Sequence, residues 1–371
     1  MILATTVQLV YWWGVFARLA FYDPAREKVG LPGSPQAGAS VLICARNEAA
    51  NLRDNLPHIL EQAYSGLWEV IVIDDASTDG TAAVLEQLQQ QYSRLRVLRV
   101  AEKTFPGKKH ALAQGIAAAR YEHLFFTDAD CRPASGQWLS CMAAALLKTP
   151  ETEIALGYAP MRREVRWGGR LLNGWARFET AQTAIQYFSF ALSGWPYMGV
   201  GRNLAWKKSL FNRSGGFSRH LHRPSGDDDL LVNATAHAGN TAICLQPESF
   251  MYSDGERSWP GWLRQKRRQL DAGKRYRPAH QLALAVLSLS HTLHYFLLLV
   301  LLIAGFGMIT AAFCYLLRSV SLLFLYGKIL PKLREQRLLS QVPIYDTLFA
   351  AYYGAFVPLF LINNRHAHTW K

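Results

Sequence analysis

The longest uninterrupted apolar stretch of the chain lies near its C-terminal end. Residues 281–317 contain no Asp, Glu, Lys or Arg. As one helix this stretch would be about 55 Å long, whereas the hydrocarbon core of a bilayer is about 30 Å thick. We therefore predict two spans that turn near residues 305–307, the second reaching about residue 326. Arg318 then lies inside a span and must snorkel or find a partner. A buried soluble hairpin is the alternative, but it would normally show a polar face.

Two weaker apolar stretches flank this one. Residues 1–17 are uncharged, and Arg18 and Lys28 follow them. Because a positive n-region and a small-residue cleavage site are absent, we predict an uncleaved anchor over residues 1–22 rather than a signal peptide. Residues 347–362 are also free of charge, which is short for a span. We expect three or four spans in all, two or three of them in the C-terminal region, residues 281–371.

Basic residues beside these stretches predict the orientation of the chain. A cluster after the second long span should lie on the cytoplasmic side, namely Lys328, Lys332, Arg334 and Arg337. If residues 18–28 and the whole middle region share that side, the N-terminus is outside and the catalytic body is cytoplasmic. The sequence thus predicts a multi-pass protein of the inner (cytoplasmic) membrane.

Between the membrane segments, short apolar runs alternate with helical stretches. The runs at residues 40–45, 69–74, 95–100 and 121–127 predict strands, and residues 48–62, 80–92 and 108–119 predict the helices between them. Continuous apolar strands separated by helices are typical of an α/β domain, a mostly parallel sheet with helices on both faces. We predict this domain over residues 38–256, with its ligand at the carboxyl ends of the strands.

Polar side chains follow the predicted strands at that edge. Arg46 and Glu48 come after the first strand, Asp75 after the second, and Asp128 and Asp130 after the fourth. Neither a dinucleotide-binding G-x-G-x-x-G nor a P-loop is present, so phosphate must be held in another way. The two aspartates after the fourth strand are two residues apart, and an extended chain would aim both the same way. Such hard oxygen ligands suit Mg²⁺ or Mn²⁺ bound together with a substrate phosphate.

Composition narrows the classes of protein. Half of the residues are hydrophobic, only 18% are charged, and Lys and Arg outnumber Asp and Glu by 40 to 27. This argues against a disordered chain and against a wholly soluble globule. The five cysteines show no metal-binding spacing, and a reducing compartment fits them.

Much of the positive charge precedes the long apolar stretch. Basic residues crowd residues 257–277, interleaved with Trp259 and Trp262, and predict an interfacial amphipathic helix over residues 257–280 that faces anionic lipid. Nucleic-acid binding is the competing interpretation, but these charges adjoin a hydrophobic span, so we expect no nucleic-acid partner. His291 and His294, three residues apart on a span, predict interhelical hydrogen bonds, with an intramembrane site as the alternative.

Several of these segments resemble, in order and spacing, the motifs of one family. SVLICARNE at residues 40–48, VIDDASTDGT at 72–81, GKKHAL at 107–112 and TDAD at 127–130 look like the successive motifs of family 2 glycosyltransferases. GVGRNLA at 199–205, GGF at 215–217 and GDDDLL at 226–231 fit the acceptor half. The resemblance covers about residues 38–275. It implies an inverting, membrane-anchored bacterial type of enzyme with the GT-A nucleotide-sugar-binding fold.

The resemblance also implies how the nucleotide is bound. Asp75 resembles the family's uracil-binding aspartate, with Arg46 and Glu48 lining the same pocket. A simpler interpretation is that Asp75, Ser77 and Asp79 cap the helix that begins near residue 80.

A second set of residues would hold the diphosphate. Lys108 would neutralise its oxygens or those of the uridine. Asp130 would bind the Mn²⁺ or Mg²⁺ that bridges the diphosphate, and Asp128 would contact the ribose or a metal-bound water.

Membrane-embedded relatives add positive charge from a Gln-x-x-Arg-Trp motif on an interfacial helix. Here Gln265 and Arg268 keep two of those residues, but Gln269 stands in place of the Trp. In processive synthases that Trp lies by the acceptor sugar, so its loss argues against processive synthesis. A lipid-facing basic helix is the alternative role for this segment.

The aspartates at residues 227–229 contain the expected catalytic base. Aligning Gly226 and Gly239 with the family's two glycines puts Asp228 at the base position and Asp227 where the family has Glu. Asp228 would take the proton of the acceptor hydroxyl. Repulsion between adjacent carboxylates raises the pKa of at least one, as a base requires. The alternative is that all three only lie at a helix N-terminus, and Asp229 fits that role best.

The sequence therefore predicts a metal-dependent inverting glycosyltransferase. It would move a hexosyl or N-acetylhexosaminyl group from a nucleotide sugar, expected to be a UDP-sugar, to a membrane lipid or lipid-linked acceptor at the cytoplasmic face. A polysaccharide synthase and exporter of the same family is one alternative. A catalytically inactive sugar-nucleotide-binding scaffold is another, but the retention of Asp75, Asp130 and Asp228 argues against it.

Overall fold

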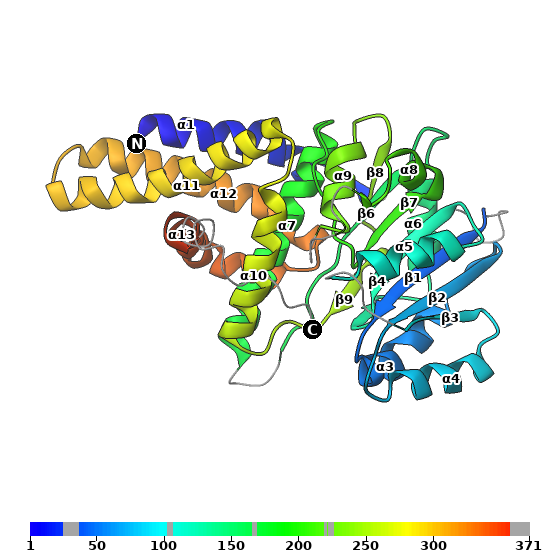
Figure 1. Cartoon of the computed structure of the whole chain (residues 1–371). Coiled ribbons are helices and arrows are strands. Elements are labelled where there is room, and N and C mark those ends of the chain that lie inside the picture. The colour runs from blue at the N-terminus through cyan, green and yellow to red at the C-terminus, as the bar shows by residue number, and fades with distance from the viewer. Residues whose placement is uncertain (25–36, 102–106, 165–168, 219–220, 222–225, 357–371) are drawn as a thin grey trace.

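One seven-stranded sheet organises the middle of the chain (Figure 1). The computed structural model describes residues 1–24, 37–101, 107–164, 169–218, 221 and 226–356. The strands are β1 Ala39–Ala45, β2 Trp68–Asp75, β3 Leu95–Val100, β4 His123–Asp128, β6 Ile154–Gly157, β7 Leu204–Lys207 and β8 Thr241–Cys244. Their order is β3-β2-β1-β4-β7-β6-β8, and β7 runs antiparallel to both of its neighbours. A small second sheet pairs β5 (Cys131–Pro133) with β9 (Met251–Ser253).

Helices cover both faces of the large sheet. On one face lie α3 (Ala49–Leu60), α4 (Thr81–Gln91) and α6 (Trp138–Leu146), packed on alternate residues of β1 such as Val41 and Ile43. The other alternate residues, such as Leu42, face α5 (Lys109–Ala118) and the long α7 (Arg170–Leu192). This alternation is what a strand buried on both faces requires. The mostly parallel sheet with two helical layers is confirmed, and the early strands and helices agree with their predicted ranges within two residues.

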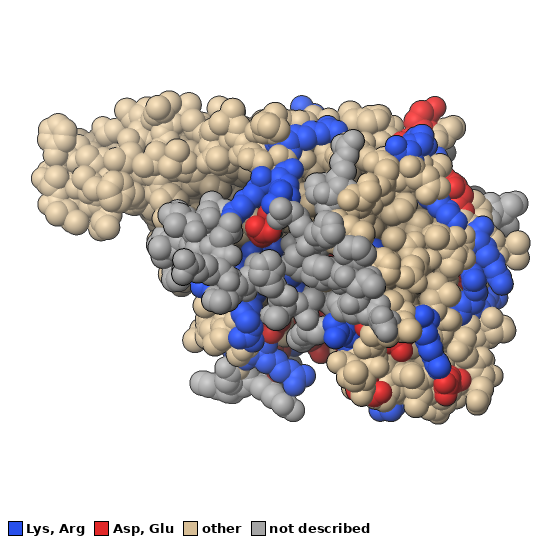
Figure 2. Space-filling view, viewed as in Figure 1, with Lys and Arg blue, Asp and Glu red and all other residues tan. Residues whose placement is uncertain are grey.

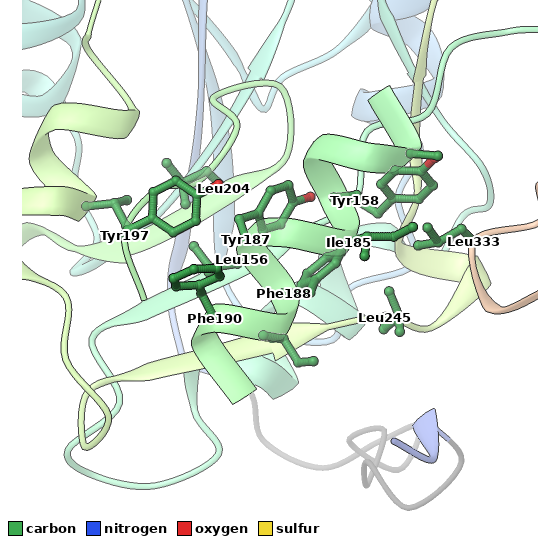
Figure 3. Packing of buried hydrophobic residues seen from close by; sticks show 14 of the residues in the cluster. Leu156, Tyr158, Ile185, Tyr187, Phe188, Phe190, Tyr197, Leu204, Leu245 and Leu333 are labelled. Atoms are coloured by element: carbon green, nitrogen blue, oxygen red, sulfur yellow. The ribbon is translucent and has the colours of Figure 1, made fainter. Parts of the chain in front are cut away.

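The core beside α7 is strongly aromatic. Figure 3 shows Tyr187 and Phe188 of α7 close to Leu156 of β6, and all three are fully buried. The Tyr187 hydroxyl donates to the carbonyl of Gly157, 2.8 Å away, so its polar group is satisfied inside the core. Because α7 packs on the sheet along its apolar side, it is a rigid base for the elements that lie against it.

The apolar helices pack together and project away from the sheet (Figure 1). They are α1 (Ile2–Val10), continued by η1 (Tyr11–Phe16) and α2 (Ala17–Ala20), then α11 (Pro278–Ala304) and α12 (Met308–Lys332). Gly305 and Gly307 make the predicted turn between α11 and α12, with φ of 64° and 65°. On the face seen in Figure 2 the projecting part carries no Lys, Arg, Asp or Glu.

Three helical stretches in the described part of the chain are long and apolar enough to cross a membrane: residues Ile2–Ala20, Pro278–Ala304 and Met308–Lys332. The weaker stretch at residues 347–362 begins within α13 (Val342–Ala351) and η7 (Tyr352–Phe356). Its remaining residues lie outside the described part, so the count of three or four spans stays a prediction.

A buried ionic cluster joins these helices. Arg318 of α12 is fully buried and pairs with Asp346 of α13 through two contacts, Nη1–Oδ2 at 2.6 Å and Nη2–Oδ1 at 3.2 Å. The same carboxylate accepts a hydrogen bond from Tyr295 at 2.6 Å, and His291 Nε2 lies 3.2 Å from it. Gln8 of α1 accepts from Arg318 Nη2 at 3.3 Å. Arg318 has therefore found a partner rather than snorkelled.

The predicted interhelical bonding of the histidines is also present. His294 Nδ1 lies 3.0 Å from Thr5 Oγ1, which joins α11 to α1. Beside this pair, Gln8 Nε2 donates to Ser290 Oγ at 2.7 Å. Both residue pairs connect the first helix of the chain to a helix nearly three hundred residues later, so the N-terminal segment is an integral part of the bundle.

The basic segment before α11 forms a helix, α10 (Trp259–Gly273), but one side of it faces protein. Trp262 and Lys266 are buried against α7, where Glu179 Oε2 accepts from Trp262 Nε1 at 3.2 Å and lies 2.7 Å from Lys266 Nζ. The expectation that these two residues face lipid is therefore wrong. Their stable partner is a buried carboxylate, which would be left unpaired if the helix detached. Arg264 and Arg267 are exposed on the same helix.

Candidate active site

The order of the strands brings the predicted residues to one edge. Because β2, β1 and β4 are neighbours, Asp75 at the end of β2, Arg46 just after β1, and Asp128 at the end of β4 lie side by side. Asp75 is only 2% exposed. The Nε atom of Arg46 is buried and has no hydrogen-bond partner within the described ranges. A half-buried arginine with a buried, unpartnered Nε–H fits a site that awaits an anionic or polar ligand.

Lys108 joins two distant parts of the chain at this edge. Its Nζ lies 2.8 Å from Asp128 Oδ1 and 3.1 Å from Asp227 Oδ2. Burial alone would lower the pKa of Lys108, but the charges of Asp128, Asp227 and Asp228 outweigh it and raise that pKa well above its ordinary value. Lys108 therefore stays charged and connects the end of β4 to the aspartates at residues 227–229.

The buried thiol of Cys44 lies near the charged residues of this edge of the sheet. Burial raises the pKa of Cys44, on β1, and the nearby charges that act on it are Lys108, Asp227, Asp128 and Asp75. Residues separated by more than 150 positions in the sequence thus share one small region. The convergence on which the predicted chemistry depends is present in the structure.

Asp128 and Asp130 have opposite electrostatic environments. Burial would raise the pKa of Asp128, but Lys108 overrides it and that pKa is lowered. Burial and the charge of Asp128 raise the pKa of Asp130, whose Oδ1 accepts from Cys131 Sγ at 3.2 Å. A cation placed beside Asp130 would remove this repulsion, so the pair fits a divalent metal.

The described residues supply only part of such a metal site. No group of three or more His, Cys, Asp or Glu side chains that could hold a metal occurs among the described residues. Mg²⁺ and similar hard cations commonly take only one or two carboxylates and complete their coordination with water and substrate phosphates. The arrangement therefore fits a metal that arrives with a phosphate-bearing ligand.

The three adjacent aspartates separate into different roles. Asp227 pairs with Lys108, and Asp229 accepts from the Tyr276 hydroxyl at 2.8 Å. Asp228 caps α9 (Asp229–Thr235), accepting from the backbone N–H of Asp229 at 2.8 Å and of Gly201 at 2.6 Å. Asp228 is also the most exposed of the three. It is therefore held in place by the backbone while remaining accessible to a ligand.

Two of these aspartates, Asp228 and Asp229, have raised pKa values, and the sequence predicted this for at least one. Desolvation and the charge of Asp227 raise the pKa of Asp228, although Lys108 opposes them. Burial and Asp228 raise the pKa of Asp229 to about 8. Gly201 is required beside Asp228, because a Cβ there would lie 2.9 Å from Asp228 Oδ2. A carboxylate with a raised pKa is a better proton acceptor than an ordinary one.

Two residues near Asp75, namely Ser77 and Asp79, have structural roles. Asp79 accepts from the backbone N–H of Thr81 at 2.9 Å and of Ala49 at 3.3 Å, so it caps the first turns of α4 and α3. Ser77 accepts from the N–H of Asn47 at 3.0 Å and holds the two strand-end loops together. The capping interpretation therefore describes Asp79, whereas Asp75 belongs to the end of β2.

Two arginines complete the electrostatics of the edge. Arg202 lies in the motif at residues 199–205 but was not among the predicted site residues. It donates to Ser253 Oγ, and its charge acts on both Asp128 and Asp130. Its position within the motif at residues 199–205 could have suggested a role in the site. The charge of Arg268 on α10 also acts on Asp128. Gln265 has a buried Oε1 with no partner among the described side chains and backbone groups. The charge of Arg268 thus reaches the sheet edge from α10.

Comparisons with known proteins place the chain among transferases. Residues 40–207 match the model of the Glycosyl transferase family 2. The chain is 36% identical over 101 residues to a beta-monoglucosyldiacylglycerol synthase of Nostoc sp., and 28% identical over 127 residues to a poly-beta-1,6-N-acetyl-D-glucosamine synthase of Staphylococcus aureus. These matches cover 27% and 33% of this chain, but only 22% and 29% of the relatives.

A solved structure shows the same fold over nearly the whole chain. The mannosyltransferase PcManGT of Pyrobaculum calidifontis, solved in complex with GDP-Man and Mn2+, is 19% identical, with a TM-score of 0.59. The similarity covers 95% of this chain and 96% of that one. The seven-stranded sheet, its two helical layers and the similarity to this structure show that the chain has the GT-A fold. Residues 40–207 match the family 2 glycosyltransferase model, which confirms the resemblance inferred from the sequence.

Proposed function

We propose that this glycosyltransferase is an inverting enzyme that transfers a sugar from a nucleotide diphosphate, a UDP-sugar, to a membrane lipid or lipid-linked acceptor. The observation that carries the proposal is the pairing of Lys108 with both Asp128 and Asp227. It joins the end of β4, where a donor diphosphate would lie, to the segment that contains the predicted base, Asp228. Donor and acceptor chemistry thus meet within a few ångströms of one ammonium group.

The donor half of the site would be built from the strand ends. Asp75 would accept a hydrogen bond from the base, and Arg46, with its unpartnered Nε, would line the nucleotide pocket together with Glu48. Asp130, assisted by Asp128, would hold Mn²⁺ or Mg²⁺ against the diphosphate. When bound there, the cation would offset the negative charge that develops on the leaving diphosphate.

Positive side chains of the protein would share that work. Lys108 would lie against the diphosphate or uridine oxygens as a point charge. Arg268, which already acts on Asp128, would approach the leaving group from α10 with Gln265 beside it. Arg202, whose charge acts on both Asp128 and Asp130, would also contribute. Developing charge is best stabilised by groups that are already fixed in position, as these are.

Asp228 would act as the general base. The acceptor hydroxyl oxygen attacks the anomeric carbon while its proton passes to the Asp228 carboxylate. The bond between that carbon and the diphosphate oxygen breaks in the same step, so configuration at the carbon inverts. Asp227, bound to Lys108, would keep the ammonium group at the place where both reactants meet.

The acceptor would reach the site from the cytoplasmic leaflet. α11, which is long and apolar enough to cross a membrane, begins five residues after the end of α10, and α10 carries Arg268. The site therefore lies close to the start of a proposed span. We place the enzyme in the inner membrane as a multi-pass protein with residues 38–256 in the cytoplasm. The Nostoc relative is by its name a synthase of a glucosyl diacylglycerol, and a lipid acceptor is consistent with it.

A polysaccharide synthase is the second candidate function. The Staphylococcus aureus relative is by its name such an enzyme. However, Gln269 replaces the Trp expected after Arg268, and Gln269 is instead occupied as an acceptor for Lys266 Nζ at 2.7 Å. We therefore favour transfer of a single sugar over processive synthesis.

The test is a donor and acceptor screen with the full chain in detergent or lipid nanodiscs. A panel of UDP-, GDP- and other nucleotide sugars is supplied with Mn²⁺, Mg²⁺ or EDTA, with and without membrane lipid extract. We expect release of UDP and a glycolipid, detected by mass spectrometry, only with metal and lipid together. Long polymer instead of glycolipid would favour the second candidate. Donor binding without any transfer under these conditions would support the inactive scaffold and overturn the proposal.

A further inference from the structure

The short helix that follows the proposed base docks on the junction between α10 and α11. Asp229, its first residue, accepts from the Tyr276 hydroxyl at 2.8 Å. Asn233, one turn further, accepts from the backbone N–H of Arg277 at 2.7 Å, and its Nδ2 lies 3.0 Å from His280 Nδ1. These contacts tie both turns of α9 to the residues from which the first long apolar helix starts.

Each of these contacts is buried. Asp229 and Tyr276 are both 8% exposed, and Asn233 and His280 are less exposed still. The Tyr276 ring also packs edge-on against Tyr197, with ring centroids 5.8 Å apart. Losing such a buried hydrogen bond is costly in free energy, because the carboxylate or amide would remain buried without a partner.

α9 depends on these contacts for its position. It has only seven residues, and an isolated helix of that length is not stable in water. Asp229 Oδ1 has no hydrogen-bond partner in the described ranges, so the Tyr276 hydroxyl is the one side-chain hydrogen bond described for this carboxylate. The backbone N–H of the same residue holds Asp228 Oδ1 at 2.8 Å. Tyr276 is therefore two bonded contacts away from the proposed base.

We propose that Tyr276 is a positioning residue for the glycosyl transfer step. Its hydroxyl fixes Asp229, Asp229 fixes the backbone N–H that orients Asp228, and the base is thereby set at a constant place relative to the membrane-proximal end of α11. The inference rests on the proposed role of Asp228. It adds that the base is aligned by the segment that enters the membrane, and not only by the nucleotide-binding sheet.

The chain offers a matched pair of variants to test this role. Tyr276→Phe removes the hydroxyl and keeps the ring, so the aromatic packing stays. Tyr197→Phe is the control, because it removes a buried hydroxyl from the neighbouring ring. That hydroxyl donates to Gln186 Oε1 at 3.5 Å and not to Asp229. We expect Tyr276→Phe to lower kcat by roughly tenfold to a hundredfold, since misplacement of a reacting group by about 1 Å can have that effect. The KM for the nucleotide sugar should remain unchanged, and Tyr197→Phe should resemble the wild type in both parameters.

Two variants of Asp229 distinguish alignment from general damage. Asp229→Asn retains an oxygen that can accept from Tyr276 and should keep kcat within a few-fold of the wild type. Asp229→Leu cannot accept and should lose as much as Tyr276→Phe. In the double variant Tyr276→Phe/Asp229→Leu the losses should not multiply, because both changes remove the same contact. Donor affinity and the thermal midpoint, measured for every variant, report whether each is folded.

The outcomes separate the inference from the proposed function. If the wild type transfers sugar and Tyr276→Phe has an unchanged kcat, the positioning role is wrong while the function stands. If Tyr276→Phe raises the donor KM in proportion to its loss of kcat, the effect is general and the role is also wrong. If Tyr276→Phe does not fold, the Asp229 variants carry the test, and equal losses in Asn and Leu overturn the inference. Absence of transfer by the wild type with every donor and acceptor would instead overturn the proposed function.

Discussion

The chain buries two clusters of charge, and they differ in how completely they are balanced. In the helical bundle, the Asp346 carboxylate receives Arg318 through two contacts and Tyr295 through a third. At the sheet edge, Lys108, Arg202 and Arg268 lie near several carboxylates, among them Asp128, Asp130, Asp227 and Asp228. The first cluster is closed by the protein itself. In the second cluster, burial and a neighbouring carboxylate raise the pKa values of Asp130 and Asp228.

This difference separates a structural cluster from a functional one. A closed ion pair connects helices and needs nothing further, whereas buried carboxylates that repel one another are costly unless a cation or a proton compensates them. Perturbed groups of the second kind are typical of active sites. On this comparison the bundle cluster holds α12 and α13 together, and we propose that a ligand completes the charge balance at the edge.

The largest expected effect is from removing the base of the open cluster. Asp228→Asn keeps the size of the side chain but cannot take a proton, and we expect transfer to fall by roughly 10²- to 10⁴-fold. Donor binding, measured by calorimetry or fluorescence, should persist because the strand-end residues are unchanged. Asp254→Asn, at an exposed aspartate paired with Arg162, is the matched control. Wild-type turnover of the Asp228 variant would contradict the assignment.

Breaking the closed cluster should affect stability rather than chemistry. Asp346→Leu leaves Arg318 buried and unpaired, and we expect the free energy of unfolding to fall by about 3–5 kcal/mol. Thermal unfolding in detergent, or the amount of folded protein recovered from membranes, measures this. Replacing both partners, Arg318→Met with Asp346→Leu, should recover most of the stability. Equal stability of the single variant and the wild type would show that the pair is not structural.

A smaller effect is expected on the metal requirement. Asp130→Asn removes one carboxylate that would hold the cation but leaves Asp128 paired with Lys108. We expect the Mn²⁺ concentration for half-maximal transfer to rise by at least about tenfold, which corresponds to about 1.4 kcal/mol of binding free energy. Saturating metal should restore part of the activity. An unchanged metal titration would place the cation elsewhere or remove it from the reaction.

The smallest expected effect is a shift in pH dependence. The base works as a carboxylate, so transfer is lost as the pH falls through its pKa. Because that pKa is raised in the folded protein, the loss should occur at a higher pH than for an ordinary aspartate. Asp227→Asn removes a charge that raises it, and the acid limb of kcat/KM against pH should then move to lower pH. Movement in the opposite direction would contradict the assumed coupling.

Much of the fold could be predicted because it depends on local pattern. The buried strands β1, β2 and β4 are short apolar runs, and their carboxyl ends are marked by Arg46, Asp75 and Asp128 in the sequence itself. The turn at Gly305 and Gly307 follows from the length of the apolar stretch. Motif order was enough to point to the family. Each of these features is encoded in neighbouring residues, whose side-chain periodicity reflects which faces are buried.

Contacts between distant segments could not be read in this way. Nothing near Arg318 in the sequence points to Asp346, nothing near Lys108 points to Asp227, and nothing near Trp262 points to Glu179. The antiparallel insertion of β7 between β4 and β6 is equally invisible locally. The sequence by itself determined which elements form and which chemical groups are available. Only the tertiary structure decided which of those groups meet, because pairing depends on how whole elements pack and not on the residues beside each one.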